Sequence, residues 1–196
     1  MERDQALQDF VDAAEAAFKA KAATEASRRS LDALFADLRT PKPLNPAPPE
    51  RLPVCRWIEP ALAAGFGDPL LARLADRFAA IEPRLVWTRR ERFDETASPG
   101  FPDGHANAVI LGPGGLEERT DLMLGLSLMA PGVRYPDHTH APEETYLVLS
   151  ESEFHQEKND WFRPGIGGSF YNRPGIVHAM RSLDTPLFAF WALREA

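Results

Sequence analysis

The fold of this chain is decided by the stretch GVRYPDHTHAPEE, residues 132–144, and by a later histidine, His178. His138 and His140 are two positions apart, so on a β-strand their side chains point to the same face. Glu144 follows four residues after His140. Three imidazole nitrogens and one carboxylate oxygen suit one divalent transition metal ion, namely Zn(II), Fe(II), Mn(II) or Ni(II). The pattern therefore predicts such an ion, bound by His140, Glu144 and His178, with His138 as a fourth ligand.

A histidine taken singly is more often a surface or core residue than a metal ligand. This chain has only five histidines, however, and three of them belong to the one pattern. That concentration favours a metal site. The other two, His105 and His155, lie in polar stretches and are expected to be exposed. Glu143 is expected to be a solvated carboxylate that faces away from the metal.

Composition limits the class of protein. The chain has 196 residues, 44% of them hydrophobic, which is enough for one packed domain or for a domain with an extension. Its net charge of -7 gives no basic surface for nucleic acid. No apolar run approaches the length of a membrane span, and the first ten residues lack a signal-peptide core. The single cysteine, Cys55, is compatible with a reducing compartment, so we expect a cytoplasmic protein that binds neither nucleic acid nor membrane.

The N-terminal part has a helical pattern. Apolar residues in the first forty positions recur at spacings of three and four, which is typical of an amphipathic helix. Whether they form one helix or two stays open, because residues 24–30 are polar without a strong breaker. Six prolines in Pro41–Pro53 predict an extended connector. Asp68 and Pro69 then predict the start of a further helix, which Pro83 ends.

From Arg84 onward, short stretches rich in β-branched and aromatic residues are separated by Gly/Pro turns. Many short strands of this kind indicate an antiparallel sandwich or barrel. We therefore predict a mainly β protein in which a helical segment, residues 1–83, packs on a barrel formed by residues 84–196. A helix that binds a partner protein is the less favoured interpretation of the N-terminal part. The expected strands are Leu85–Arg89, Ala108–Leu111, Leu122–Met129, Thr145–Leu149, Gly168–Tyr171 and Leu187–Leu193.

Two tyrosines lie near the predicted metal. Tyr146 is two positions after Glu144, so both side chains should point to the inner face, roughly 7 Å apart along the strand. Tyr135 lies in the predicted loop before His138 and can enter the same mouth. A tyrosine of ordinary pKa, about 10, is a poor base, but a neighbouring divalent cation favours the phenolate, which is a plausible general base. The alternative for Tyr146 is an ordinary strand aromatic whose hydroxyl is hydrogen-bonded.

The arrangement resembles the two sequence motifs of the cupin family. The first motif, a glycine, five residues, HxH, three residues and a glutamate, is matched by residues 132–144. The second, in which a Pro/Gly turn precedes the last histidine, is matched by GSFYNRPGIVH, residues 168–178. Two departures affect turns more than ligands: Glu151 stands where the first motif usually ends in glycine, and the Pro-Gly pair before His178 is one residue tighter than usual. The resemblance implies a cupin barrel, a double-stranded β-helix or jelly roll.

A closer resemblance covers the stretch YPDHTHAPEETY, residues 135–146, together with His178 and Trp191. These residues look like those of the cupin-type dimethylsulfoniopropionate (DMSP) lyases, nearest to the DddQ group. The chain length and the helical N-terminal segment suit that group as well. The resemblance implies a carbon–sulfur lyase in which Tyr146 is the base and Tyr135 is a second catalytic or substrate-binding residue.

The implied substrate is a small zwitterion with a carboxylate and a sulfonium. A metal-bound carboxylate acidifies the adjacent C–H, and loss of that proton with departure of dimethyl sulfide leaves acrylate. The resemblance assigns Trp191 and His138 to substrate binding. Phe188 and Phe190 alternate with Trp191, so these three rings cannot all line one cavity. Aromatic faces suit a weakly hydrated cation, and the candidates are Trp161, Phe162, Tyr171, Phe188, Phe190 and Trp191.

Other functions stay open at this point, because a cupin metal site supports several reactions. One alternative is another metal-dependent cupin enzyme, an Fe(II) dioxygenase or an isomerase acting on a small acid. A second is a non-enzymatic cupin that binds a small molecule. In each case the expected partner is a small molecule, and the chain is expected to be a monomer or a homodimer.

Overall fold

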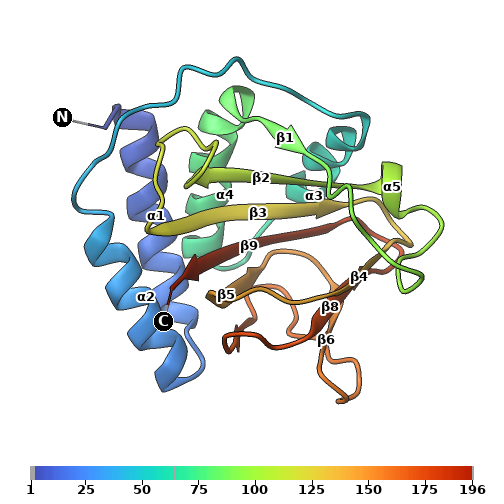
Figure 1. Cartoon of the computed structure of the whole chain (residues 1–196). Coiled ribbons are helices and arrows are strands. Elements are labelled where there is room, and N and C mark those ends of the chain that lie inside the picture. The colour runs from blue at the N-terminus through green and yellow to red at the C-terminus, as the bar shows by residue number, and fades with distance from the viewer. Residues whose placement is uncertain (1–2, 64, 196) are drawn as a thin grey trace.

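Two antiparallel sheets form the C-terminal half of the protein, seen in a computed structural model that describes residues 3–63 and 65–195. The larger sheet has the strand order β1-β2-β3-β9-β5-β7, and the smaller has the order β4-β8-β6. Figure 1 shows the smaller sheet below and to the right of the larger one. The strands are β1 (Trp87–Thr88), β2 (His105–Leu111), β3 (Leu122–Met129), β4 (Arg134–His138), β5 (Glu143–Val148), β6 (Ser152–Gln156), β7 (Ser169–Asn172), β8 (His178–Ser182) and β9 (Leu187–Arg194).

The sequence pattern predicted the strands of the larger sheet but missed those of the smaller one. Strands β4, β6 and β8 carry charged and imidazole side chains instead of an apolar alternation. Their pairing with one another, with β8 in the centre, comes from the tertiary fold. The two sheets nevertheless form the predicted cupin barrel, and the predicted fold class is confirmed.

The helices lie mainly in the N-terminal half. The open question of one helix or two is settled by Thr24, whose hydroxyl accepts from the backbone N–H of Ser27 in a capping box that starts a second helix. Asp68 caps the predicted later helix by accepting from the N–H of Leu70 at 2.8 Å. The helices are α1 (Gln5–Lys21), α2 (Glu25–Asp37), α3 (Ile58–Ala63), α4 (Pro69–Ile81) and α5 (Phe101–Gly104), with 3-10 turns at Pro53–Trp57 and Glu82–Arg84.

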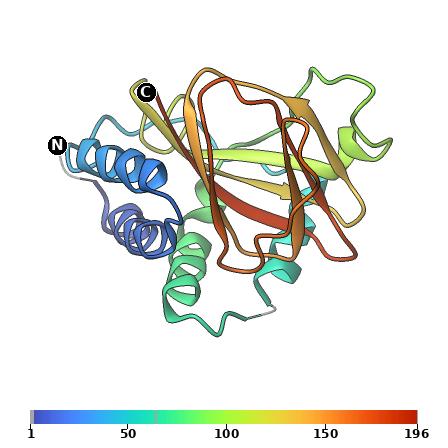
Figure 2. The same ribbon diagram turned by 90° about the horizontal axis from the view of Figure 1, so that it is seen from below.

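Helices α1 and α4 cover the outer face of the larger sheet, while the smaller sheet faces its other side (Figures 1 and 2). Phe190 of β9 packs against Phe10 of α1 and Phe78 of α4, with ring centroids 5.9 and 5.5 Å apart. Phe78 also contacts Phe188 edge to face at 5.3 Å. The apolar stripes of these helices are therefore buried on the same sheet that carries the site on its opposite face. Among the described residues, no helix is long and apolar enough to cross a membrane.

Candidate metal centre and substrate cavity

Three histidines come together at one end of the barrel. His138 of β4 and His178 of β8 are direct partners across the two strands, and their ring centroids are 4.0 Å apart. The two-residue spacing predicted that His138 and His140 lie on one strand. In the structure β4 ends at His138, and His140 lies in the turn that follows. One ligand atom from each of the three histidines lies within 4.8 Å of the others. The turn is held beside His178 by Gly175, whose N–H donates to the carbonyl of His140 at 3.0 Å.

The orientation of all three imidazoles leaves the same nitrogen available. Each Nδ1 faces a backbone carbonyl, which only accepts hydrogen bonds, so in the neutral imidazole Nδ1 carries the proton and Nε2 has the free lone pair. The Nε2 atoms of His140 and His178 are buried without a hydrogen-bond partner in the described part of the chain. A buried, unpaired lone pair is what a metal ion satisfies. The Nδ1 contacts run from His138 to Pro136 at 2.9 Å, from His140 to Pro142 at 2.9 Å and from His178 to Ile176 at 3.2 Å.

Glu144, at the start of β5, supplies the oxygen of the set. Its Oε2 atom lies 3.4 Å from Nε2 of His140 and 3.2 Å from Nε2 of His178. Burial by itself would raise the pKa of the Glu144 carboxyl, but contact with the charged forms of the two imidazoles outweighs it and holds that pKa well below its ordinary value. The same contact with Glu144 outweighs burial at His140 and raises the pKa of that imidazole. Burial, assisted by His178, lowers the pKa of His138 to about 3. Glu144 is thus a carboxylate and His138 a neutral imidazole, which are the forms that bind divalent ions.

A pair of amides that the sequence did not single out orients this carboxylate. Asn172 of β7 is the register partner of Glu144, and its Nδ2 donates to Glu144 Oε2 at 2.8 Å. Gln156 of β6 in turn donates from Nε2 to Asn172 Oδ1 at 2.6 Å. Gln156 thereby fixes which way the Asn172 amide points. Asn172 could have been predicted from the register of β5 and β7, because that register pairs it with Glu144.

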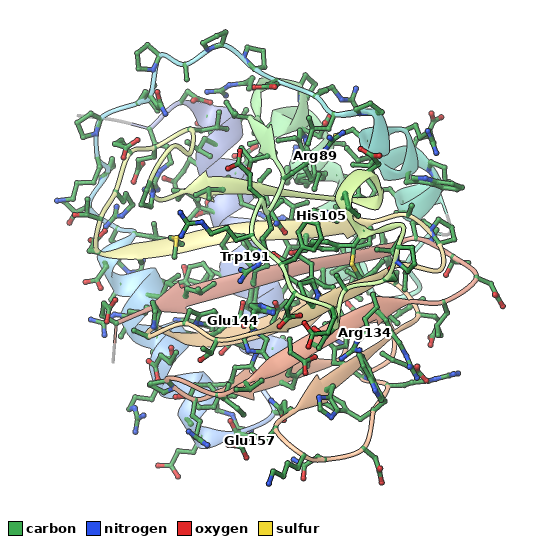
Figure 3. The ribbon with its side chains drawn as sticks, turned by 45° about the vertical axis from the view of Figure 1, so that its right-hand side comes forward. Arg89, His105, Arg134, Glu144, Glu157 and Trp191 are labelled. Atoms are coloured by element: carbon green, nitrogen blue, oxygen red, sulfur yellow. The ribbon has the colours of Figure 1, made fainter. Side chains whose placement is uncertain are left out.

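A cavity of about 240 Å³ opens between the two sheets beside the histidine cluster. Figure 3 shows Glu144 and Trp191 on the strands that form one of its walls. Its lining combines both tyrosines and three of the four predicted ligands, all but His178, with a basic side chain and several thioether and aliphatic groups. The lining residues are Arg90, Asn107, Val109, Met123, Ser127, Tyr135, His138, His140, Glu144, Tyr146, Met180, Trp191 and Leu193.

Both candidate tyrosines line this cavity. Tyr146 lies on β5 and stacks on Phe170, with centroids 5.0 Å apart and planes 15° apart. Its pKa is raised well above the ordinary value by burial and then by the charge of Glu144. Tyr135 lies within β4, not in a preceding loop, and burial also raises its pKa, an effect that Asn107 and Arg90 oppose. A base at either position therefore needs additional positive charge close to the phenol.

Only Trp191 of the six candidate aromatics lines the cavity. Phe188 and Phe190 point to the opposite face of β9 and pack on α4. Trp161 lies beside the guanidinium of Arg181 at 4.2 Å, and Phe162 packs against Phe170. The sixth candidate, Tyr171, donates from its hydroxyl to a carboxylate outside the cavity. Side-chain alternation along β9 therefore puts the core aromatics on one face of the strand and the cavity aromatic on the other.

Two expectations for polar residues were wrong. His105 is fully buried, because it stacks on Phe101 at 3.7 Å and its Nε2 accepts from the backbone N–H of Arg90 at 2.8 Å. Glu143 faces away from the histidines but is not solvated, since it is 4% exposed and accepts from Tyr171 Oη at 2.5 Å. Through His105 the fold brings Arg90 to the cavity, although nothing in the sequence around Arg90 signalled such a role.

Comparisons with known proteins agree with this architecture. A sequence model of the dimethylsulfoniopropionate lyase family matches residues 26–189. The dimethylsulfoniopropionate lyase DddQ of Ruegeria pomeroyi is 30% identical over 159 residues, which cover 78% of this chain and 74% of that protein. The putative dimethylsulfoniopropionate lyase DddL of Cereibacter sphaeroides is 29% identical over 158 residues, covering 80% of this chain and 65% of that protein.

Solved structures extend the similarity to almost the whole chain. The crystal structure of the DMSP lyase DddQ from Ruegeria pomeroyi DSS-3 has a TM-score of 0.69 at 26% identity, covering 98% of this chain and 92% of that one. A chain from the crystal structures of the DMSP lyases RdDddP and RnDddQII has a TM-score of 0.71 at 23% identity, covering 97% and 93%. Because the family model spans most of the sequence, this chain belongs to the dimethylsulfoniopropionate lyase family.

Proposed function

We propose that this protein is a metal-dependent lyase that cleaves DMSP into dimethyl sulfide and acrylate by a tyrosine-assisted β-elimination. Family membership supports the overall reaction. The observation that supports the metal and the tyrosine is their meeting in one cavity, where His140, Glu144 and Tyr146 share the lining. A cavity of about 240 Å³ is of the size that suits a small substrate.

The donor set fits one divalent transition ion. The buried, unpaired Nε2 atoms of His140 and His178 and the carboxylate of Glu144 would hold it, with His138 as a fourth ligand or a near neighbour. Zn(II), Fe(II), Mn(II) and Ni(II) all accept such nitrogen and oxygen ligands. When bound, the ion supplies a Lewis acid that holds the substrate carboxylate, acidifies the adjacent C–H and favours ionised phenol.

Tyr146 is the proposed base. Its phenolate takes the proton from the carbon next to the substrate carboxylate, and the C–H electron pair becomes the new C=C bond. The C–S bond breaks at the next carbon, and its electrons leave with sulfur as neutral dimethyl sulfide. Tyr146 then holds the proton at Oη until solvent removes it. Its pKa is raised, so a base here needs a neighbouring cation. Its position two residues after Glu144, with the His178 ring centroid 6.5 Å away, supports such a neighbour for the phenol.

The other cavity residues bind and orient the zwitterion. The face of Trp191 suits the sulfonium, because a weakly hydrated cation is attracted by an aromatic ring. The carboxylate end would contact Tyr135, the second tyrosine. It would also contact His138, which is a ligand or a neighbour of the metal and whose ring centroid lies 4.9 Å from that of Tyr135. Val109, Met123 and Leu193 give the rest of the cavity an apolar wall that limits the access of water.

Headspace detection of dimethyl sulfide from purified, metal-loaded protein given DMSP tests this function. We expect dimethyl sulfide and acrylate in equal amounts, without consumption of oxygen. Oxygen-dependent turnover would favour the dioxygenase alternative, and binding of DMSP without any product would favour a non-enzymatic cupin. A monomeric or homodimeric state and a cytoplasmic location stay predictions, which size-exclusion chromatography and cell fractionation would check.

A further inference from the structure

A chain of hydrogen bonds runs along the cavity wall from Trp191 to Tyr135. The indole Nε1–H of Trp191 donates to Oγ of Ser127 at 3.1 Å. The Ser127 hydroxyl donates to Oδ1 of Asn107 at 2.6 Å, and Nδ2 of Asn107 donates to Oη of Tyr135 at 3.3 Å. Asn107 and Ser127 are direct partners across β2 and β3, so strand pairing holds the centre of the chain. It therefore joins the proposed sulfonium-binding ring to the second tyrosine.

The direction of every bond in this chain is fixed at the indole end. An indole N–H can only donate, so Ser127 Oγ accepts there and has its single proton left for Asn107. The Ser127 hydroxyl can donate only to the oxygen of the Asn107 amide, so the NH2 group of that amide points towards Tyr135. An amide NH2 also only donates, so Tyr135 Oη accepts from it. The hydroxyl proton of Tyr135 is consequently free for a partner in the cavity.

Gly125 allows the indole to reach this position. It is the register partner of Trp191 across β3 and β9. A Cβ atom at residue 125 would lie 2.3 Å from Cη2 of Trp191 and 2.5 Å from the carbonyl oxygen of Ala108, both far inside contact distance. With glycine, the six-membered part of the indole can lie over the β3 backbone while Nε1 meets Ser127. The first bond of the chain thus depends on a residue without a side chain.

We propose that Asn107 is a positioning residue for the reaction. Ser127 and Trp191 fix the orientation of its amide, which donates to Tyr135 and so leaves the Tyr135 hydroxyl to donate its own proton to the carboxylate of the substrate. This inference rests on the proposed function, because it names how one end of the zwitterion is held. The guanidinium of Arg90, 5.9 Å from the centre of the Tyr135 ring, adds positive charge at the same end. The carboxylate end and the sulfonium end of the cavity are thereby linked by one polar chain.

Asn107→Asp separates this role from simple packing. Aspartate has the same size and shape as asparagine, but its carboxylate only accepts hydrogen bonds. The Tyr135 hydroxyl would therefore donate to this carboxylate instead of pointing its proton into the cavity. We expect kcat/KM for DMSP to fall roughly ten- to hundred-fold, the range for losing a hydrogen bond to a charged group, with most of the change in KM. Asn107→Ala removes the donor but leaves the Tyr135 proton free, so its loss should be smaller. A packing role predicts the reverse order, because alanine leaves a gap and aspartate does not.

Calorimetric titration with acrylate gives a readout that does not need turnover. Acrylate should bind the metal-loaded Asn107→Asp variant roughly ten-fold or more weakly than wild type, with metal content unchanged. Asn159→Asp, the same substitution at an exposed asparagine outside the cavity, should bind acrylate as wild type does. If Asn107→Asp fails to fold, Ser127→Ala, which frees the Asn107 amide to rotate, should weaken acrylate binding in the same direction.

The outcomes distinguish this inference from the proposed function. A wild-type protein that binds acrylate but releases no dimethyl sulfide would end the proposed function, while the comparison of acrylate affinities would still decide the role of Asn107. Asn107→Asp with wild-type acrylate affinity, or with higher kcat/KM than Asn107→Ala, would overturn the positioning role. Weakened binding in the aspartate variant, together with the larger kinetic loss, would support it.

Discussion

Asn172 donates a hydrogen bond from Nδ2 to Oε2 of Glu144 at 2.8 Å, the same oxygen that lies 3.2 Å from Nε2 of His178. The amide therefore fixes the carboxylate in the orientation that faces the histidines. Removal of such an orienting group typically lowers metal affinity about 10–100-fold. We expect this loss for Asn172→Ala in a competition titration with a chelator. Asn159→Ala, at an exposed asparagine in the turn after β6, should keep wild-type affinity. Equal affinities of the two variants would remove Asn172 from the metal centre.

The proposed ligand role of His178 predicts loss of the metal in His178→Ala. The substitution deletes a buried nitrogen that has no hydrogen-bond partner among the described residues. Elemental analysis should find one divalent ion per chain in wild type and almost none in the variant. His155→Ala, which changes a histidine outside the cluster, should keep wild-type metal content. Full metal content in His178→Ala would show that the histidine cluster has another purpose.

Phe78 connects α4 to the barrel, so its truncation tests whether residues 1–83 and the barrel form one folding unit. It is fully buried and contacts both Phe188 and Phe190 of β9. Phe78→Ala should lower the free energy of unfolding by about 3–5 kcal/mol in urea denaturation. Phe93→Ala, at a residue that is 48% exposed, should cost far less. Limited proteolysis that released a stable, active barrel without residues 1–83 would contradict the single unit.

His105 predicts a dependence of stability on pH. Burial, reinforced by the charges of Arg89 and Arg90, lowers its pKa below the ordinary value of 6.5. Above that value both the folded and the unfolded chain carry neutral His105, so the group has no effect. As the pH falls below it, the unfolded chain binds the proton first and the folded state loses stability. His105→Gln should flatten the slope of unfolding free energy against pH below 6.5. An unchanged slope would show that His105 binds its proton equally in both states.

The parts of this protein that the sequence predicted are those with a local signal. Asp68 and Pro69 start α4 as their capping chemistry requires, and the ligand spacing from His138 to Glu144 led to the fold and the family, both of which are confirmed. The alternation along β9 predicts Trp191 on the opposite face from Phe188 and Phe190, and of these three rings only that of Trp191 lines the cavity. In each case the physical cause lies within a few residues of the effect.

The missed features depend on contacts between distant parts of the chain. Asn107 and Ser127 meet through the register of β2 and β3, which composition does not reveal. The buried position of His105 includes a contact with the backbone of Arg90, which is 15 residues away in the sequence, so the polar neighbours of His105 were misleading. The smaller sheet escaped prediction because its strands carry the polar residues of the site and become strands only by pairing with one another.

The central claim is that a tyrosinate at Tyr146 removes the substrate proton. Tyr146→Phe keeps the ring that stacks on Phe170 and deletes only the hydroxyl, so fold and metal content should survive. Tyr135→Phe is the matched variant, because it deletes the other phenolic hydroxyl in the same cavity.

The most direct measurement is the rate of dimethyl sulfide release from DMSP by metal-loaded wild type and by these two variants. Loss of a general base costs roughly 10²–10⁴-fold, so we expect kcat to fall by that factor in Tyr146→Phe, and Tyr135→Phe to be impaired but still active. A nearly wild-type rate in Tyr146→Phe with an inactive Tyr135→Phe would exchange the two roles. If both variants kept nearly wild-type rates, the tyrosinate mechanism would be wrong.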